Sequence, residues 1–234
     1  MKNKLNILST LANIGFIVFL FLSILDLTCF DRNFFAKEYV KYRNAEVIGI
    51  SSEDLMKATD VLLDYIQDRR DDLHVTAIIQ NQQREVFNQR EIDHMIDVKE
   101  LYKFAMHTRN IAILIFIFIL FVFIYSKRKL SLLFLCHGYK RACGIVGSLM
   151  LGVAFFAYVD FTRFWTLFHH IFFRNDLWLL NPSTDILIMM VPEGFFYDLV
   201  FRIVTYFLAM VVTLYAFSCG VIYLYKNKLE KKEG

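Results

Sequence analysis

Two stretches of the sequence place histidines where they could transfer protons. His94 follows Glu91 by three residues and precedes Asp97 by three, so on a helix the three side chains would share one face. A carboxylate at that spacing can orient an imidazole and favour its protonated form. A solvated charged face would have the same spacing, and both interpretations stay open from the pattern alone.

The second stretch is the apolar run 168–173, FHHIFF, which contains the adjacent histidines His169 and His170. Apolar surroundings disfavour the imidazolium and keep a neutral ring available as a base near pH 7. The wider segment 161–198 also holds both tryptophans and both prolines of the chain. Such a segment fits an active site at a membrane surface, and it equally fits an aromatic belt that only anchors the protein.

Four further polar or amphipathic residues of this segment are candidates for orienting a histidine or binding a substrate: Arg163, Trp178, Asp185 and Glu193. Each could equally fix the loop or anchor it at the interface. The four cysteines have no CxxC spacing, and no HExxH motif or serine nucleophile motif is present. We therefore expect no metal and no cofactor.

The elements that would position these residues follow from the hydropathy of the chain. Hydrophobic residues make up 57% of the chain, and its mean hydropathy is +0.44. This apolar content exceeds that of an ordinary soluble domain. A helix needs roughly 20 residues to cross the apolar core of a bilayer. Runs without a charged residue cover 5–25, 110–126, 142–159 and 203–225. The sequence predicts a mainly α, polytopic membrane protein with four transmembrane helices.

The basic residues predict how these helices are oriented. They gather near the N-terminus, at 127–141 and at 226–234, so the positive-inside rule places both termini in the cytoplasm. Segment 31–108 carries 15 acidic and 11 basic residues and would face outward. Short juxtamembrane clusters of this kind orient helices, so we expect no nucleic-acid binding.

The expected division places the two histidine stretches on the same side of the membrane. It comprises transmembrane helix 1 (1–29), a small extracytoplasmic cap (30–108), transmembrane helix 2 (109–126), a cytoplasmic loop (127–141), transmembrane helix 3 (142–160), the aromatic-rich extracytoplasmic or interfacial segment (161–198), transmembrane helix 4 (199–225) and a cytoplasmic tail (226–234).

Within the cap, Ser51 or Ser52 ahead of Glu53 and Asp54 predicts a helix start, and the apolar stripe that follows extends to about residue 70. Residues 75–79 predict a short strand or an extended segment. A second helix is expected from about 83 to 107, and it could continue into the second span because 51–137 contains neither proline nor glycine. Asn181-Pro182 predicts a turn.

The residues that could carry chemistry also resemble a known family. The pattern His-Met-x-Asp-Val after a glutamate, at 91–98, is similar to the lipoprotein intramolecular transacylases of low-GC Gram-positive bacteria. The pattern Phe-His-x-Ile-Phe-Phe at 168–173 is also similar to this family. It is followed by Trp178 and by the pattern Leu-Ile-x-x-x-Pro-Glu-x-Phe-Phe at 187–196, which are similar as well. The resemblance covers essentially the whole chain.

The resemblance implies an acyl transfer within one diacylated lipoprotein at the cell membrane. The sn-2 acyl chain of the diacylglyceryl group would move to the α-amino group of the N-terminal cysteine, which gives a lyso-form lipoprotein. The family uses two histidines, which by motif position are His94 and His169, with His170 one residue away from the second assignment. Which histidine is the base is not fixed by the sequence.

Two other classes of function remain open from the sequence. One is an intramembrane metalloenzyme that uses His94, His169, His170 and a carboxylate as ligands. The other is a non-catalytic lipoprotein-binding or envelope-assembly protein. Membrane lipid would be a partner in every case.

Overall fold

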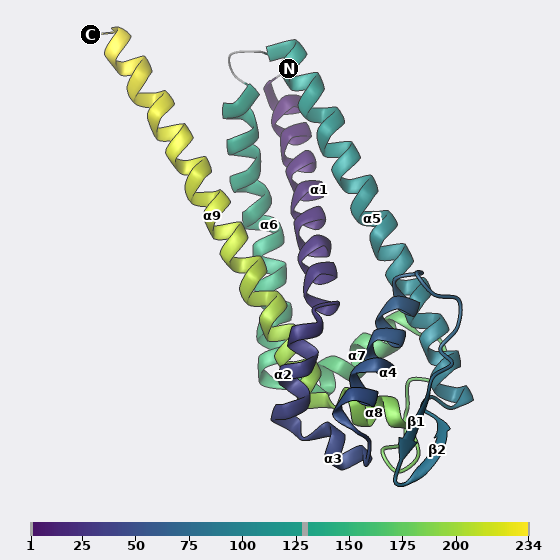
Figure 1. Ribbon diagram of the computed structural model, residues 1–234. Helices are drawn as coiled ribbons and strands as arrows, with labels where there is room; N and C mark the ends of the chain where they lie inside the picture. Colours follow the sequence, from purple (N-terminus) through teal and green to yellow (C-terminus); the bar gives the residue numbers. More distant parts are fainter. Residues whose placement is uncertain (1, 128–130, 234) are drawn as a thin grey trace. The chain divides into compact units, whose positions relative to one another are not determined.

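The computed structural model describes residues 2–127 and 131–233, and these are predominantly helical (Figure 1). By length and composition, four of the helices could cross a membrane: α1 (Lys2–Cys29), α5 (Gln89–Lys127), α6 (Ser131–Val159) and α9 (Glu193–Glu233). The predicted mainly α, four-span class is confirmed. The backbone divides into two compact units, 1–26 with 106–159 and 202–234, and 27–105 with 160–201.

The first unit contains most of the apolar length of the four long helices. Ile17 of α1 packs with Tyr139 and Ala142 of α6 and Phe207 of α9. Ala12 of α1 forms a second cluster with residues of α5, so α1 contacts each of the other three helices. Only 11 to 22% of the most apolar window of each helix is buried, which leaves apolar surfaces that lipid would have to cover.

Close packing of α1 against α6 depends on a polar contact and a glycine. The Ser9 hydroxyl donates to the Phe134 carbonyl at 2.6 Å, and the Asn13 amide donates to the Leu135 carbonyl at 3.2 Å. A Cβ atom on Gly138 would lie 2.0 Å from Ser9 Oγ and 2.7 Å from the Ser9 carbonyl oxygen. The two helix backbones approach closely here because residue 138 has no side chain.

Gly138→Ala is therefore expected to lower the free energy of unfolding by about 1–3 kcal/mol, because the α1 backbone must move away. Gly147→Ala is the matched control, since a Cβ atom at Gly147 of the same helix would meet nothing within 4 Å. Thermal unfolding in detergent micelles measures both. Equal unfolding temperatures for the two variants would contradict the packing described here.

The second unit begins with α2 (Arg32–Tyr42), α3 (Asn44–Ile48) and α4 (Ser52–Ile66). The Ser51 hydroxyl caps α4 by accepting from the Asp54 N–H at 3.0 Å, as the sequence predicts, but the helix ends at Ile66 and not near residue 70. The strands β1 (Thr76–Ile79) and β2 (Gln82–Glu85) pair antiparallel around Gln80 and Asn81, which both have positive φ.

The hairpin corrects the expected start of the second cap helix, but this helix does continue into the second span. Residues 83–85, predicted as the start of a helix, belong to β2, and α5 begins at Gln89. From there α5 runs without a break for 39 residues, which at about 1.5 Å per residue is longer than a bilayer core of about 30 Å. Its charged first half therefore extends beyond the apolar part.

The rest of the second unit comes from segment 160–201. It contains α7 (Phe161–Phe172), the short α8 (Ile186–Met190) and the start of α9, with the predicted turn at 181–185 between α7 and α8. The sequence did not indicate α7 as a separate helix.

Another difference concerns 127–141, which we expected to be a loop. Residues 131–141 are helical and form the start of α6. Arg128 and Lys129, which contribute to the basic cluster there, lie outside the described residues.

Candidate active site

His94 and His169 lie together inside the second unit. The imidazole of His94 comes from the second turn of α5 and is 6% exposed, and that of His169 comes from the last turn of α7 and is 7% exposed. Their ring centroids are 6.3 Å apart. The ring of Phe173 contacts both, at 5.2 Å from His94 and 5.6 Å from His169. The adjacent His170 is exposed, so the two histidines of the doublet differ sharply in their surroundings.

One hydrogen bond defines the orientation of the His169 ring. Its Nδ1 lies 2.8 Å from the Trp165 carbonyl oxygen. A carbonyl can only accept, so Nδ1 carries the proton, and in the neutral ring Nε2 holds the free lone pair. The ring also stacks on Trp178 at 4.7 Å and meets the edge of Trp165 at 4.8 Å. Nδ1 of His169 is therefore the protonated nitrogen, and Nε2 is the basic nitrogen of the neutral ring.

Burial lowers the pKa of His169 below its ordinary value of 6.5, and this outweighs the Trp165 carbonyl, which favours the charged ring. A neutral ring should therefore persist to lower pH than in a free histidine. Titration of histidine-labelled protein by ring ¹⁵N NMR, with His169→Asn to assign the signal, is expected to give a midpoint below 6.5. A midpoint at or above that value would contradict the buried setting.

The His94 ring has fewer polar contacts. Its Nδ1 is buried and has no hydrogen-bond partner among the described residues. The same holds for the indole Nε1 of Trp178, which stacks on His169. A buried polar nitrogen left without a partner costs about 1–3 kcal/mol, so such groups in a site are available to a ligand.

A network of buried polar groups fixes the first turn of α5 and hence His94. Asn88 and Glu91 form a capping box: the Glu91 N–H donates to Asn88 Oδ1 and the Asn88 N–H donates to Glu91 Oε2. Glu91 is fully buried, and its Oε1 accepts from the Leu187 N–H at 2.5 Å. Glu91 thus ties α5 to the start of α8.

Asp185 extends this network. Its carboxylate accepts from the Asn181 N–H, the Thr184 hydroxyl and the Asn88 amide. Burial raises the pKa of Asp185, but these hydrogen bonds outweigh it, and the pKa lies below its usual value. The side chain is 4% exposed and acts as an anion that holds the 181–185 turn against Asn88.

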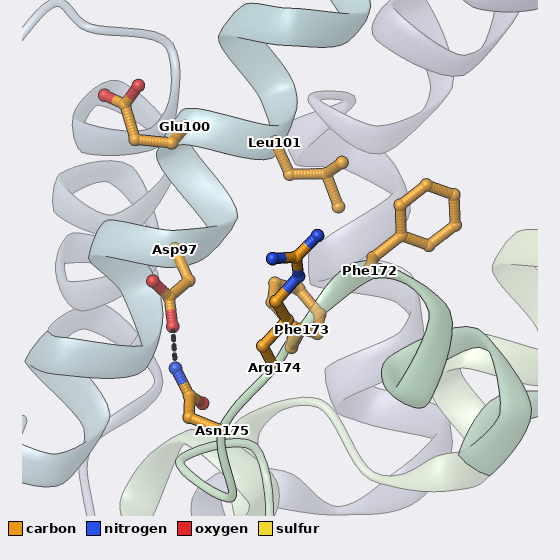
Figure 2. A pocket seen from close by; sticks show the side chains of 7 residues that line it. All are labelled: Asp97, Glu100, Leu101, Phe172, Phe173, Arg174 and Asn175. Atoms are coloured by element: carbon orange, nitrogen blue, oxygen red, sulfur yellow. Dashed lines mark hydrogen bonds between the residues drawn. The ribbon is translucent and has the colours of Figure 1, made fainter.

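Phe173 also lines an open pocket of about 340 Å³ (Figure 2). Its lining comes from α5 and from the end of α7 and the residues after it: Asp97, Glu100, Leu101, Phe172, Phe173, Arg174 and Asn175. The Asn175 amide donates to Asp97 Oδ2 at 2.8 Å, which joins the two walls.

Comparison with known proteins identifies the family of this chain. The family model "Lipoprotein intramolecular transacylase Lit" matches residues 10–196. This chain belongs to the lipoprotein intramolecular transacylase family. It is therefore an acyltransferase and a multi-pass membrane protein, and the predicted family is confirmed.

Solved structures show the same fold. In meso structures of the membrane integral lipoprotein intramolecular transacylase Lit from Bacillus cereus are similar over nearly the whole length. One has a TM-score of 0.74 and 20% identity and covers 100% of this chain and 99% of its own. Two variants of that protein, with one histidine replaced by arginine or by alanine, have TM-scores of 0.73. No curated protein matches the chain by sequence.

Within this Lit family member, the predicted site residues separate into two groups. His94, His169 and Trp178 lie together, and Asp185 belongs to the network behind them. Arg163 and Glu193 are exposed, in the first turns of α7 and α9. Glu193 accepts from the Thr162 hydroxyl at 2.5 Å, which links those two turns.

The carboxylates that flank His94 in sequence have other partners. Both oxygens of Glu91 accept backbone N–H groups, and Asp97 accepts from Asn175. Sequence spacing also missed Phe173 and Trp165, which contact the imidazoles. The Asn-x-x-Glu pattern at 88–91 is typical of a helix capping box, and it could have indicated that Glu91 binds backbone N–H groups. No group of three potential metal ligands is found in the part of the chain that the structure describes.

Proposed function

We propose that this Lit family member acts on a diacylglyceryl lipoprotein. It transfers the sn-2 acyl chain of that lipoprotein to the α-amino group of the lipoprotein's N-terminal cysteine. The observation that carries the proposal is the pair of buried imidazoles, 6.3 Å apart, in a family member. Aminolysis of an ester needs a neutral amine, a base for its proton and a donor for the leaving oxygen, and two histidines can supply both.

His169 suits the role of base. Its Nδ1 proton is held by the Trp165 carbonyl, and its Nε2 lone pair is free to accept a proton from the attacking amine. The new N–C bond forms as this proton leaves, and the C–O bond to the glyceryl group breaks as that oxygen is protonated. The reaction is an isomerisation, so atoms and charge balance within one molecule.

His94 would take this proton from the His169 imidazolium and deliver it to the glyceryl oxygen. Two imidazolium rings at 6.3 Å repel each other, so the pair should carry at most one extra proton at a time. Because donor and acceptor belong to one bound substrate, the step is unimolecular, and correct orientation contributes several kcal/mol.

Aromatic rings would shield the ester from water. Trp165 stacks on Phe196 at 4.3 Å and on Phe168 at 5.2 Å, beside His169. Excluding water favours transfer to the amine over hydrolysis. The buried Nε1 of Trp178 is available to donate a hydrogen bond to the substrate carbonyl oxygen.

The other residues predicted to bind the substrate are Asp185, Arg163 and Glu193, and they have different roles in this proposal. Asp185 is a positioning residue in this proposal, because its oxygens already accept three hydrogen bonds. Arg163 and Glu193 stay proposed substrate contacts at the exposed starts of their helices. The positive-inside pattern supports cytoplasmic termini and an extracytoplasmic second unit, where the substrate's lipidated cysteine would also lie.

The test uses the purified protein in micelles with a diacylated lipoprotein. The α-amine should become unreactive to an amine-specific reagent while the mass of the N-terminal lipopeptide stays the same. A mass loss of one acyl chain would indicate a hydrolase and overturn the proposal, as would an amine that remains fully reactive.

A further inference from the structure

A single side chain, Phe173, belongs both to the lining of the pocket and to the surroundings of the imidazole pair. Phe173 lines the pocket and its ring contacts both His94 and His169. Asp97 lies three residues after His94, about one turn along the same face of α5. A substrate atom between the imidazoles is therefore close to this pocket.

The pocket is chemically unlike the aromatic wall that Trp165, Phe168 and Phe196 form beside His169. Figure 2 shows the guanidinium of Arg174 just below Leu101, with the Asp97–Asn175 pair to its left. No ion pair of Arg174 occurs among the described residues. The two carboxylates already have partners, since Asp97 accepts from Asn175 and Glu100 pairs with Lys103. A pocket lined by a guanidinium and two carboxylates is a poor site for an acyl chain, because covering charged groups with hydrocarbon is costly.

The same groups match an extended polypeptide. Peptide carbonyls can accept from the Arg174 guanidinium, and peptide N–H groups can donate to Asp97 and Glu100. Backbone recognition of this kind does not depend on the sequence of the peptide. The substrate of the proposed reaction has such a chain attached directly to the cysteine whose amine reacts.

We infer that this pocket binds the polypeptide segment that immediately follows the lipid-bearing cysteine, through backbone contacts centred on Arg174. The inference rests on the proposed function. It assigns the two sides of the imidazole pair to the two parts of the substrate. The acyl chains lie against the aromatic wall, and the peptide leaves past Phe173.

The experiment compares two substrates in one assay. One is diacylglyceryl-cysteine amide with no further residue, and the other carries a short glycine-serine peptide after the same cysteine. Arg174→Gln is expected to lower the ratio of kcat/KM for the long substrate to that for the short one by about tenfold, as loss of a charged hydrogen bond does. Arg174→Lys, which keeps the charge, should recover part of the ratio.

Arg69→Gln is the matched control, because Arg69 is an exposed arginine outside the pocket, and it should leave the ratio unchanged. An unchanged ratio in Arg174→Gln, or an equal loss for both substrates, would overturn the peptide subsite while leaving the acyl transfer intact. A wild-type protein that converts neither substrate would overturn the proposed function and this inference with it.

Discussion

His169→Gln is expected to lower kcat for acyl transfer by about 10²–10⁴-fold, the range for loss of a general base. Glutamine keeps the polar character of the site but cannot accept a proton. The Nε2 of His169 is the basic nitrogen left free by the hydrogen bond from Nδ1 to Trp165. The rate is measured from the disappearance of the free α-amine under saturating substrate.

His170→Gln provides the matched control one residue away. His170 is exposed and contacts only the edge of Trp178 among the described rings, so its variant should retain activity within about threefold. Thermal unfolding should be similar for both variants. A large loss of activity in His170→Gln with little loss in His169→Gln would reverse the assignment.

Glu91→Ala is expected to cost about 3 kcal/mol of unfolding free energy, because two backbone N–H groups lose their acceptor in a buried place. These are the N–H groups of Asn88 and Leu187, and Glu91 itself has no exposed surface. The capping box at the start of α5 is lost at the same time. Activity should fall as well, since His94 lies one turn further along.

Glu91→Gln should have an intermediate effect, because its amide oxygen can satisfy one N–H but its amino group faces the other. Asp93→Ala is the control, two residues along, where the carboxylate accepts from the exposed Gln89 side chain and from no other described residue. Denaturant unfolding in micelles measures all three. A loss for Asp93→Ala as large as that for Glu91→Ala would contradict the role given to Glu91.

Much of the fold could be predicted because it depends on local hydropathy. The four apolar runs correspond to the four long helices, and the absence of proline and glycine from 51–137 allowed α5 to continue from the second unit into its apolar part. A strand or extended segment was predicted at 75–79, but β2, QQRE, has no apolar alternation and is held by its pairing with β1.

The site was less predictable, since its partners come from distant segments. Spacing on a helix suggested that Glu91 orients His94. Instead, the Glu91 carboxylate accepts a hydrogen bond from the N–H of Leu187, which is 96 residues away in sequence. The choice between adjacent histidines depends on which face of α7 packs inward. That face is set by Phe173 and Trp178, which lie beyond the helix and contact His169.

The central claim is tested most directly by a substrate that carries a deuterated acyl chain at sn-2 and an unlabelled chain at sn-1. After incubation with the protein, fragmentation of the N-terminal lipopeptide should find the deuterated chain on the α-amino nitrogen, with the total mass unchanged. A deuterated chain that remains on the glyceryl group, or is released as free fatty acid, would contradict the transfer.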